Sequence, residues 1–225
     1  MKVLVFTSSH SKRAYMMRQN ILNAMNQTYK HFIHSVNITL DDDAQTRDLS
    51  PLYEDLLHPN LIVNYSENAK YGFSHFNNMN CIRFVPDYEN YDVYIKMDDD
   101  DIYKSEYVEN IVNHFKDHPD TDIVSTKIST QLNGYDLYKG SYDNLGGNPN
   151  NSTYHMPMTF AFNNRAFKYI IDLGIRDVNG HDDMMWRTAW EKHNLVHRAV
   201  QNDDEIVWHI HGKNSSIPNF YINKN

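Results

Sequence analysis

The sequence predicts an α/β fold in which helices cover both faces of a mostly parallel central sheet. Two observations predict it. Short apolar runs alternate along the chain with segments whose apolar residues recur at helical spacing, which is the pattern of repeated β-α units. The chain also has 225 residues, of which 40% are hydrophobic and 22% charged, so it can form a sizeable core.

The first half of the chain is expected to form four strands and two helices. A strand at residues 2–6 and a polar turn at 7–11 precede the first helix. The apolar residues that share one face of this helix are Ala14, Met17, Ile21, Ala24 and Met25. Further strands are expected within 32–40, around 61–63 and at 91–97, with a second helix at 73–84.

The second half continues this alternation and contains one long expected loop. The remaining strands are expected at 123–128, 158–162 and 205–210, and the remaining helices at 108–115, 165–173 and from 180 onward. Residues 131–154 are rich in Gly, Asn, Ser and Tyr. We therefore expect a long mobile loop there, of the kind that is often functional.

Composition and charge exclude several classes of protein. The formal charge of −8 argues against nucleic-acid binding, because phosphate recognition needs clustered Lys and Arg. Apolar runs fall far short of the roughly 20 residues that cross a bilayer, and the start of the chain lacks a secretory signal. Cys81 is the single cysteine, which fits a reducing compartment. We expect a cytoplasmic protein with no nucleic-acid partner and no transmembrane segment.

Four consecutive aspartates follow the fourth expected strand. Neighbouring carboxylates repel one another, so a folded chain keeps them only where a cation, a cap or water offsets the charge. Side chains two apart in an extended chain point the same way, so Asp98 and Asp100 can converge on one ion. Asp99 and Asp101 would then face the other side. Carboxylates suit Mg²⁺, Mn²⁺ or Ca²⁺. The alternative is a solvated turn in which Asp101 or Ser105 caps the next helix.

A second acidic stretch is Gly180-His181-Asp182-Asp183. If a helix begins here, its N-terminal amides and dipole favour ionised carboxylates. An aspartate at this position would then be competent to accept a proton, but a simple helix cap needs the same geometry.

The third stretch is Trp208-His209-Ile210-His211, near the end of the last expected strand. His209 and His211 share one face of an extended chain. A neutral imidazole can complete a carboxylate metal site, although exposed surface histidines are the alternative interpretation.

Taken in order, these stretches resemble the nucleotide-sugar-dependent glycosyltransferases of the GT-A fold, in particular the family 2-like group. The segments that carry the resemblance are VLVFTSSHSKRAYMMRQNILNAMNQTY, GFSHFNN, YDVYIKMDDDDIY, GHDDMMWRTAW and HIHGKNSS. The resemblance covers nearly the whole chain. It implies a single GT-A domain over 1–225, with a nucleotide-sugar-binding half at about 1–101 and an acceptor-side half at about 102–225.

The resemblance also implies an activity, namely metal-dependent transfer of a sugar from a UDP- or GDP-type donor to a hydroxyl acceptor, with inversion. Asp98 and Asp100 would bind the ribose and a divalent ion, Mn²⁺ or Mg²⁺. His211, or else His209, would be a further ligand.

The acceptor's proton would go to Asp182 or Asp183, since the family's acidic motif matches either His181-Asp182 or Asp182-Asp183 here. The resemblance also implies a set of residues that hold the nucleotide sugar. They are Thr7, Ser9, Arg13, an aspartate among Asp41, Asp42 and Asp43, Lys70, Gly72, Asp98 and Asp99.

Two other functions remain open from the sequence. A non-catalytic, metal-dependent carbohydrate-binding module would use the same acidic residues without an activated donor. A sugar nucleotidyltransferase would be expected to carry a Gly-rich loop after the first strand, whereas the segment TSSHSKR has no glycine.

Overall fold

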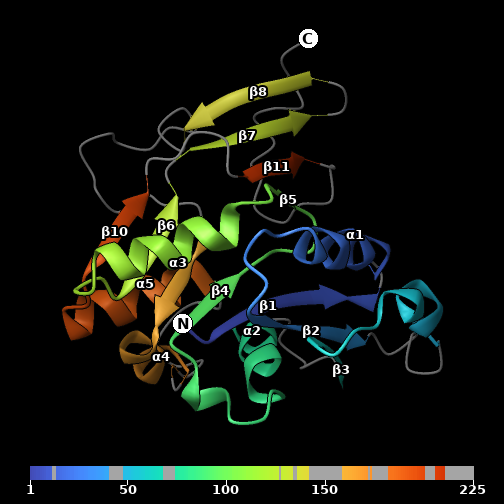
Figure 1. Cartoon of the computed structure of the whole chain (residues 1–225), viewed down its shortest axis with the longest axis horizontal. Helices are drawn as coiled ribbons and strands as arrows, with labels where there is room; N and C mark the ends of the chain where they lie inside the picture. Colours follow the sequence, from blue (N-terminus) through green and yellow to red (C-terminus); the bar gives the residue numbers. More distant parts are fainter. Residues whose placement is uncertain are drawn as a thin grey trace.

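The structure is a computed structural model that describes most of the chain. The described residues are 1–11, 14–40, 48–67, 74–126, 128–133, 136–141, 159–171, 173, 182–200 and 206–210. They form two sheets, and helices lie against the larger one (Figure 1).

The larger sheet has seven strands and confirms the mostly parallel architecture. Its order from edge to edge is β10-β6-β9-β4-β1-β2-β3. Neighbouring strands run parallel except at β9, which is antiparallel to both β4 and β6. The strands are β1 (Val3–His10), β2 (Phe32–Leu40), β3 (Leu61–Glu67), β4 (Val93–Lys96), β6 (Ile123–Thr126), β9 (Ala161–Asn163) and β10 (His197–Val200). The short strand β10 was not expected from the sequence.

The order of the strands marks where a ligand should bind. β2 and β3 lie on one side of β1, and β4 lies on its other side, so the chain changes direction between β1 and β4. In open α/β sheets, ligands bind beyond the carboxyl ends of the strands at such a switch point. Because β4 ends at Lys96, the four aspartates follow at this edge.

Helices cover both faces of the larger sheet, as alternate residues of β1 demonstrate. Val3 and Val5 pack with the apolar face of α3, whereas Leu4 and Phe6 pack on the opposite face with α2, α4 and α5. Figure 1 shows α3 on one side of the sheet and α2 on the other. The helices are α1 (Ala14–Met25), α2 (Ser74–Arg83), α3 (Tyr107–Asp117), α4 (Asn164–Ile170) and α5 (Asp182–His193). Short 3-10 turns lie at Ser50–Leu52, Glu54–Leu56 and Tyr88–Asn90.

A smaller sheet of four strands, in the order β5-β11-β7-β8, corrects part of the loop prediction (Figure 1). Its strands are β5 (Ile102–Tyr103), β7 (Ile128–Asn133), β8 (Asp136–Ser141) and β11 (Ile206–Ile210). Residues 131–133 and 136–141 are therefore strands, and 142–154 lie outside the described residues. The sequence signal was Asn133-Gly134, a dipeptide typical of tight hairpins, within a composition otherwise typical of loops.

Candidate functional site

The aspartates form a compact turn rather than a continued strand. Because β4 ends at Lys96, the alternation of side chains stops before Asp98, and the prediction that Asp101 faces away from Asp98 and Asp100 is wrong. One carboxylate oxygen from each of Asp98, Asp100 and Asp101 lies within 4.8 Å of the others. The turn thus offers three carboxylates to one point in space, where the sequence predicted two.

Asp99 has a separate role in the architecture of this turn. The residue is 2% exposed, and the Ser9 hydroxyl of β1 donates a hydrogen bond of 2.7 Å to its Oδ2 atom. This contact joins the carboxyl ends of β1 and β4 across the switch point. Two residues predicted to hold the nucleotide sugar, Ser9 and Asp99, therefore contact each other.

A buried polar network of Thr7, Asn20 and His34 is hydrogen-bonded to the backbone of the turn. The Asn20 amide of α1 donates to the Asp98 carbonyl at 2.8 Å and accepts a 3.0 Å hydrogen bond from the Thr7 hydroxyl. The Thr7 hydroxyl also lies 3.0 Å from Nε2 of His34. Since the Thr7 hydrogen goes to Asn20, its oxygen accepts from His34, which requires the Nε2–H tautomer. Thr7 thus lies in the interior, behind the turn.

Tyr103 holds the turn from the other side. Its hydroxyl accepts a 2.7 Å hydrogen bond from the Asp98 backbone N–H, and the side chain is buried. Burial raises the pKa of Tyr103 well above its ordinary value, and the nearby charges of Asp101 and Asp98 raise it further. The phenol therefore stays neutral beside the carboxylates.

The segment Gln27-Thr28, which belongs to the first motif, fixes the helix after the turn. The buried Gln27 amide donates to the Lys104 carbonyl at 2.8 Å and accepts from the Val108 N–H at 3.0 Å. Gln27 thereby satisfies a free amide at the start of α3. The N-cap residue of α3 is Glu106, without a side-chain cap bond, so the alternative that Asp101 or Ser105 caps this helix is wrong.

The backbone brings the histidine strand to the same edge. β11 pairs antiparallel with β5, with Ile206 opposite Tyr103 and Val207 opposite Ile102. β5 follows the aspartate turn directly, so the continuation of β11 through His209 runs towards that turn. The side chain of His209 and the whole of His211 lie outside what the structure describes.

The acidic helix start is linked to the turn through Trp186. α5 begins at Asp182, within the stretch 180–183 where a helix start was expected, and Trp186 lies one turn further along its buried face. The Lys96 ammonium lies 5.5 Å from the centre of the Trp186 ring and 2.9 Å from Oδ1 of Asp98. The first turns of α5 therefore lie beside the aspartate turn, although the side chains of Asp182 and Asp183 are outside the described set.

The other residues predicted to hold the nucleotide sugar lie outside the described residues. They are Arg13, Asp41, Asp42, Asp43, Lys70 and Gly72. Their roles stay predictions, as does the division of the chain at about residue 101.

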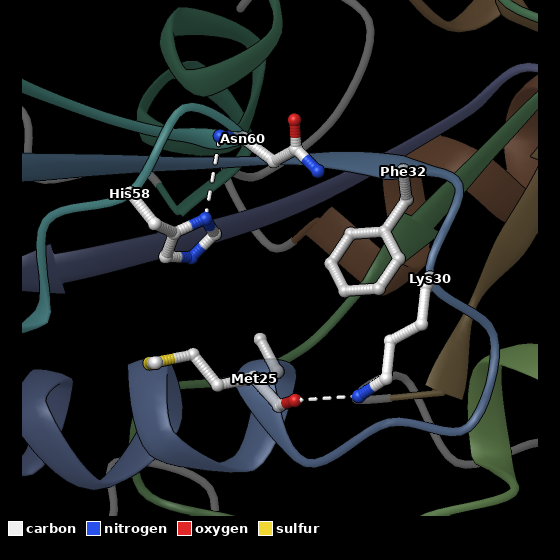
Figure 2. A pocket seen from close by; sticks show the side chains of 6 residues that line it. Met25, Lys30, Phe32, His58 and Asn60 are labelled. Carbon is white, nitrogen blue, oxygen red and sulfur yellow. Dashed lines mark hydrogen bonds between the residues drawn. The ribbon is translucent and has the colours of Figure 1, made fainter.

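A pocket of about 220 Å³ lies at the amino end of β2 (Figure 2), whereas the aspartates follow the carboxyl end of β4. Figure 2 shows that its polar groups bond locally: Lys30 Nζ donates to the Met25 carbonyl at 2.9 Å, and the Asn60 N–H donates to His58 at 3.3 Å. Phe32 lines one wall. The pocket is thus a gap beside the end of α1, without convergent charged groups among the residues that line it.

No protein-family model matches this chain, and no curated protein sequence matches it. Solved structures do share its fold. TarS 1–349 of S. aureus in complex with UDP-GlcNAc has a TM-score of 0.61 at 13% identity, over 94% of this chain and 59% of that one. The complex of TarS 1–349 with UDP has a TM-score of 0.60 at 16% identity, over 93% and 61%.

The mannosyltransferase PcManGT from Pyrobaculum calidifontis, in complex with GDP-Man and Mn²⁺, has a TM-score of 0.59 at 13% identity, over 92% of this chain and 56% of that one. The chain thus spans between 56% and 61% of the length of these three. Together they confirm the predicted GT-A fold class. None of the helices among the described residues has the length and hydrophobicity needed to cross a bilayer.

Proposed function

We propose that this protein is a metal-dependent glycosyltransferase that moves a sugar from a nucleoside-diphosphate sugar to a hydroxyl acceptor, with inversion, in glycan or polysaccharide synthesis. The observation that carries the proposal is the group of Asp98, Asp100 and Asp101 beyond β4, at the switch point of the sheet. Proteins that share the fold hold UDP, UDP-GlcNAc, or GDP-Man with Mn²⁺. The proposed setting is cytoplasmic.

The residues fit a divalent ion because they offer three carboxylate oxygens close together, which is the donor chemistry that Mn²⁺ and Mg²⁺ prefer. Asp98, Asp100 and Asp101 would hold the ion, with His209 or His211 as a further ligand. When bound, such an ion stabilises negative charge on the leaving diphosphate.

The remaining steps belong to the chain's own residues. Asp182 or Asp183, at the start of α5, would accept the proton of the acceptor hydroxyl, since the helix N-terminus favours the ionised carboxylate. Ser9 and Asp99 would orient the donor at the carboxyl end of β1, and Thr7 would support them through Asn20. Arg13, Asp41, Asp42, Lys70 and Gly72 complete the proposed donor site.

Replacing Asp100 tests the proposal. Asp100→Ala should lower metal-dependent release of UDP or GDP from nucleotide sugars by about 10³-fold or more, because transition-state charge loses its stabilisation. Asp117→Ala, which removes an exposed carboxylate from α3, is the matched control and should retain wild-type activity. Full activity in a folded Asp100→Ala variant would remove the metal role.

A non-catalytic carbohydrate-binding module would use the same three carboxylates. Calorimetry with UDP and GDP, with and without Mn²⁺, separates the two functions. A transferase should bind a nucleoside diphosphate tightly and only with the metal, whereas the module should bind neither nucleotide.

A further inference from the structure

Lys96 is a buried positive charge beside the three carboxylates. It is the last residue of β4 and is only 4% exposed. Its ammonium contacts both oxygens of the Asp98 carboxylate, at 2.9 Å from Oδ1 and 3.2 Å from Oδ2. A lysine is almost never buried this far unless its charge is balanced.

The ammonium also faces α5. It lies 5.5 Å from the centre of the Trp186 ring, within the range of a cation–π contact. The Trp186 indole N–H donates to Nδ1 of His75 in α2 at 3.2 Å, and the ring packs against Phe6 and Phe160. The ammonium therefore lies between the well-packed Trp186 ring and the Asp98 carboxylate.

This position makes Lys96 a competitor for the same oxygens that a divalent ion would use. Asp98 belongs to the group of three carboxylates, whose mutual repulsion favours any nearby positive charge. The ammonium cancels one of those negative charges, and both Asp98 oxygens are within its reach. An ion bound to Asp98 must therefore share that carboxylate with Lys96.

We propose that Lys96 is the built-in counter-ion of the aspartate turn: it weakens binding of a divalent ion alone and strengthens binding of the ion together with an anionic diphosphate. The inference rests on the proposed function. Its physical reason is that a fixed positive charge repels a second cation and attracts the anion that accompanies it. Lys96 is on this view a positioning residue that makes the site prefer metal and nucleotide as a pair.

The test measures two affinities in Lys96→Met, whose side chain keeps the apolar stem. Binding of Mn²⁺ alone is measured by titrating the purified protein and following the EPR signal of the free ion. Lys96→Met should bind Mn²⁺ alone about tenfold more tightly than the wild type does. UDP and GDP, titrated by calorimetry at saturating Mn²⁺, should bind about tenfold more weakly. A merely structural role would weaken both affinities together.

The matched control is Lys2→Met. Lys2 also lies over an aromatic ring, with its ammonium 4.3 Å from the centre of the Tyr91 ring, but at the amino end of the sheet. This control removes the same charge, and both affinities should stay within about twofold of the wild type. In an Asp98→Asn background, Lys96→Met should lose its effect on Mn²⁺, which assigns that effect to the contact between these two side chains.

Unchanged or weaker Mn²⁺ binding in a folded Lys96→Met variant would overturn the inference, as would a wild-type protein that binds no Mn²⁺ even in the presence of UDP or GDP. Should Lys96→Met fail to fold, Lys96→Gln provides the same measurement, and the same two directions are expected. Opposite shifts of the two affinities without any release of nucleotide from nucleotide sugars would support the role of Lys96 and remove the transferase function.

Discussion

The two ends of the larger sheet differ in what they hold. At the carboxyl end, Lys96, Asp99 and Asp101 are buried charged residues. Lys96 forms an ion pair with Asp98, Asp99 accepts a hydrogen bond from Ser9, and Asp101 belongs to the group of three carboxylates. At the amino end there is a pocket, and Lys30 and Asn60 on its rim are exposed. The amino end also holds one buried carboxylate, Asp122 before β6, which accepts hydrogen bonds from the Asn163 amide and the Val196 N–H. The buried charges that gather in a single turn lie at the carboxyl end.

The difference favours the carboxyl end of the sheet as the candidate functional end. A buried charge costs free energy unless it is compensated, so a turn that gathers several of them is a candidate functional site. A pocket beside a helix end needs no such purpose, because local hydrogen bonds satisfy its polar groups. We therefore expect the carboxyl end to respond to substitution far more strongly than the amino end.

The largest effect is the expected loss of stability in acid, through His34 in the buried network of Thr7 and Asn20. Burial, with a smaller contribution from nearby His58, lowers the pKa of His34 to about 3. In the unfolded chain, His34 takes up a proton near pH 6.5, whereas in the folded chain it stays neutral down to about pH 3. The stability contributed by the neutral His34 is therefore fully present above pH 6.5 and is lost progressively as the pH falls towards 3. The loss is on the order of 5 kcal/mol at pH 3.

Urea unfolding at several pH values measures this contribution. His34→Gln should remove the part of the pH slope that belongs to His34, about 1.4 kcal/mol per pH unit between these limits. His31→Gln, which changes an exposed histidine of the same chain segment, should keep the wild-type slope. An unaltered slope in His34→Gln would show that the network does not exclude the proton.

The second effect concerns the support beneath the aspartate turn. Asn20→Asp replaces the amide that donates to the Asp98 carbonyl with an oxygen that repels it. We expect a loss of about 2–3 kcal/mol in the free energy of unfolding and weaker Mn²⁺ binding, since a buried acceptor is left unsatisfied.

Asn23→Asp is the matched control for this effect. Asn23 is also buried in α1, but its amide donates to the Gln19 carbonyl of the same helix. This variant should lose stability while keeping the wild-type Mn²⁺ affinity. If both variants bind Mn²⁺ equally, the network is not specific to the turn.

The smallest effect is expected at the amino end. Lys30→Ala removes the hydrogen bond to the last carbonyl of α1, which lies at the surface. Such exposed contacts contribute little, so the Tm should change by no more than about 2 °C, with nucleotide and Mn²⁺ binding unaltered. A marked loss of nucleotide binding would reverse the comparison and make the pocket part of the site.

The extent to which the sequence predicted this arrangement varies from residue to residue. The strand within 32–40 and the helix start within 180–183 agree with the structure because apolar periodicity and acidic helix starts are local signals. The predicted direction of the Asp101 side chain was wrong because side chains alternate only within a strand, and β4 ends two residues before Asp98. The length of that strand depends on its neighbours β1 and β9 rather than on its own residues.

The roles of Gln27 and Lys96 were not predicted. Nothing near Gln27 in the sequence indicates that it satisfies the start of a helix some eighty residues later, a contact that only chain folding creates. Lys96 is two residues from Asp98 in the sequence, but its burial against Trp186 depends on α5.

By itself, the sequence determined the fold class and the residue types of the site, because periodicity and charge are properties of short segments. Only the tertiary structure decided which carboxylates converge, which charge offsets them and which end of the sheet holds them. These depend on strands that are distant in sequence ending at one edge, and buried charges are stable only where such distant partners meet.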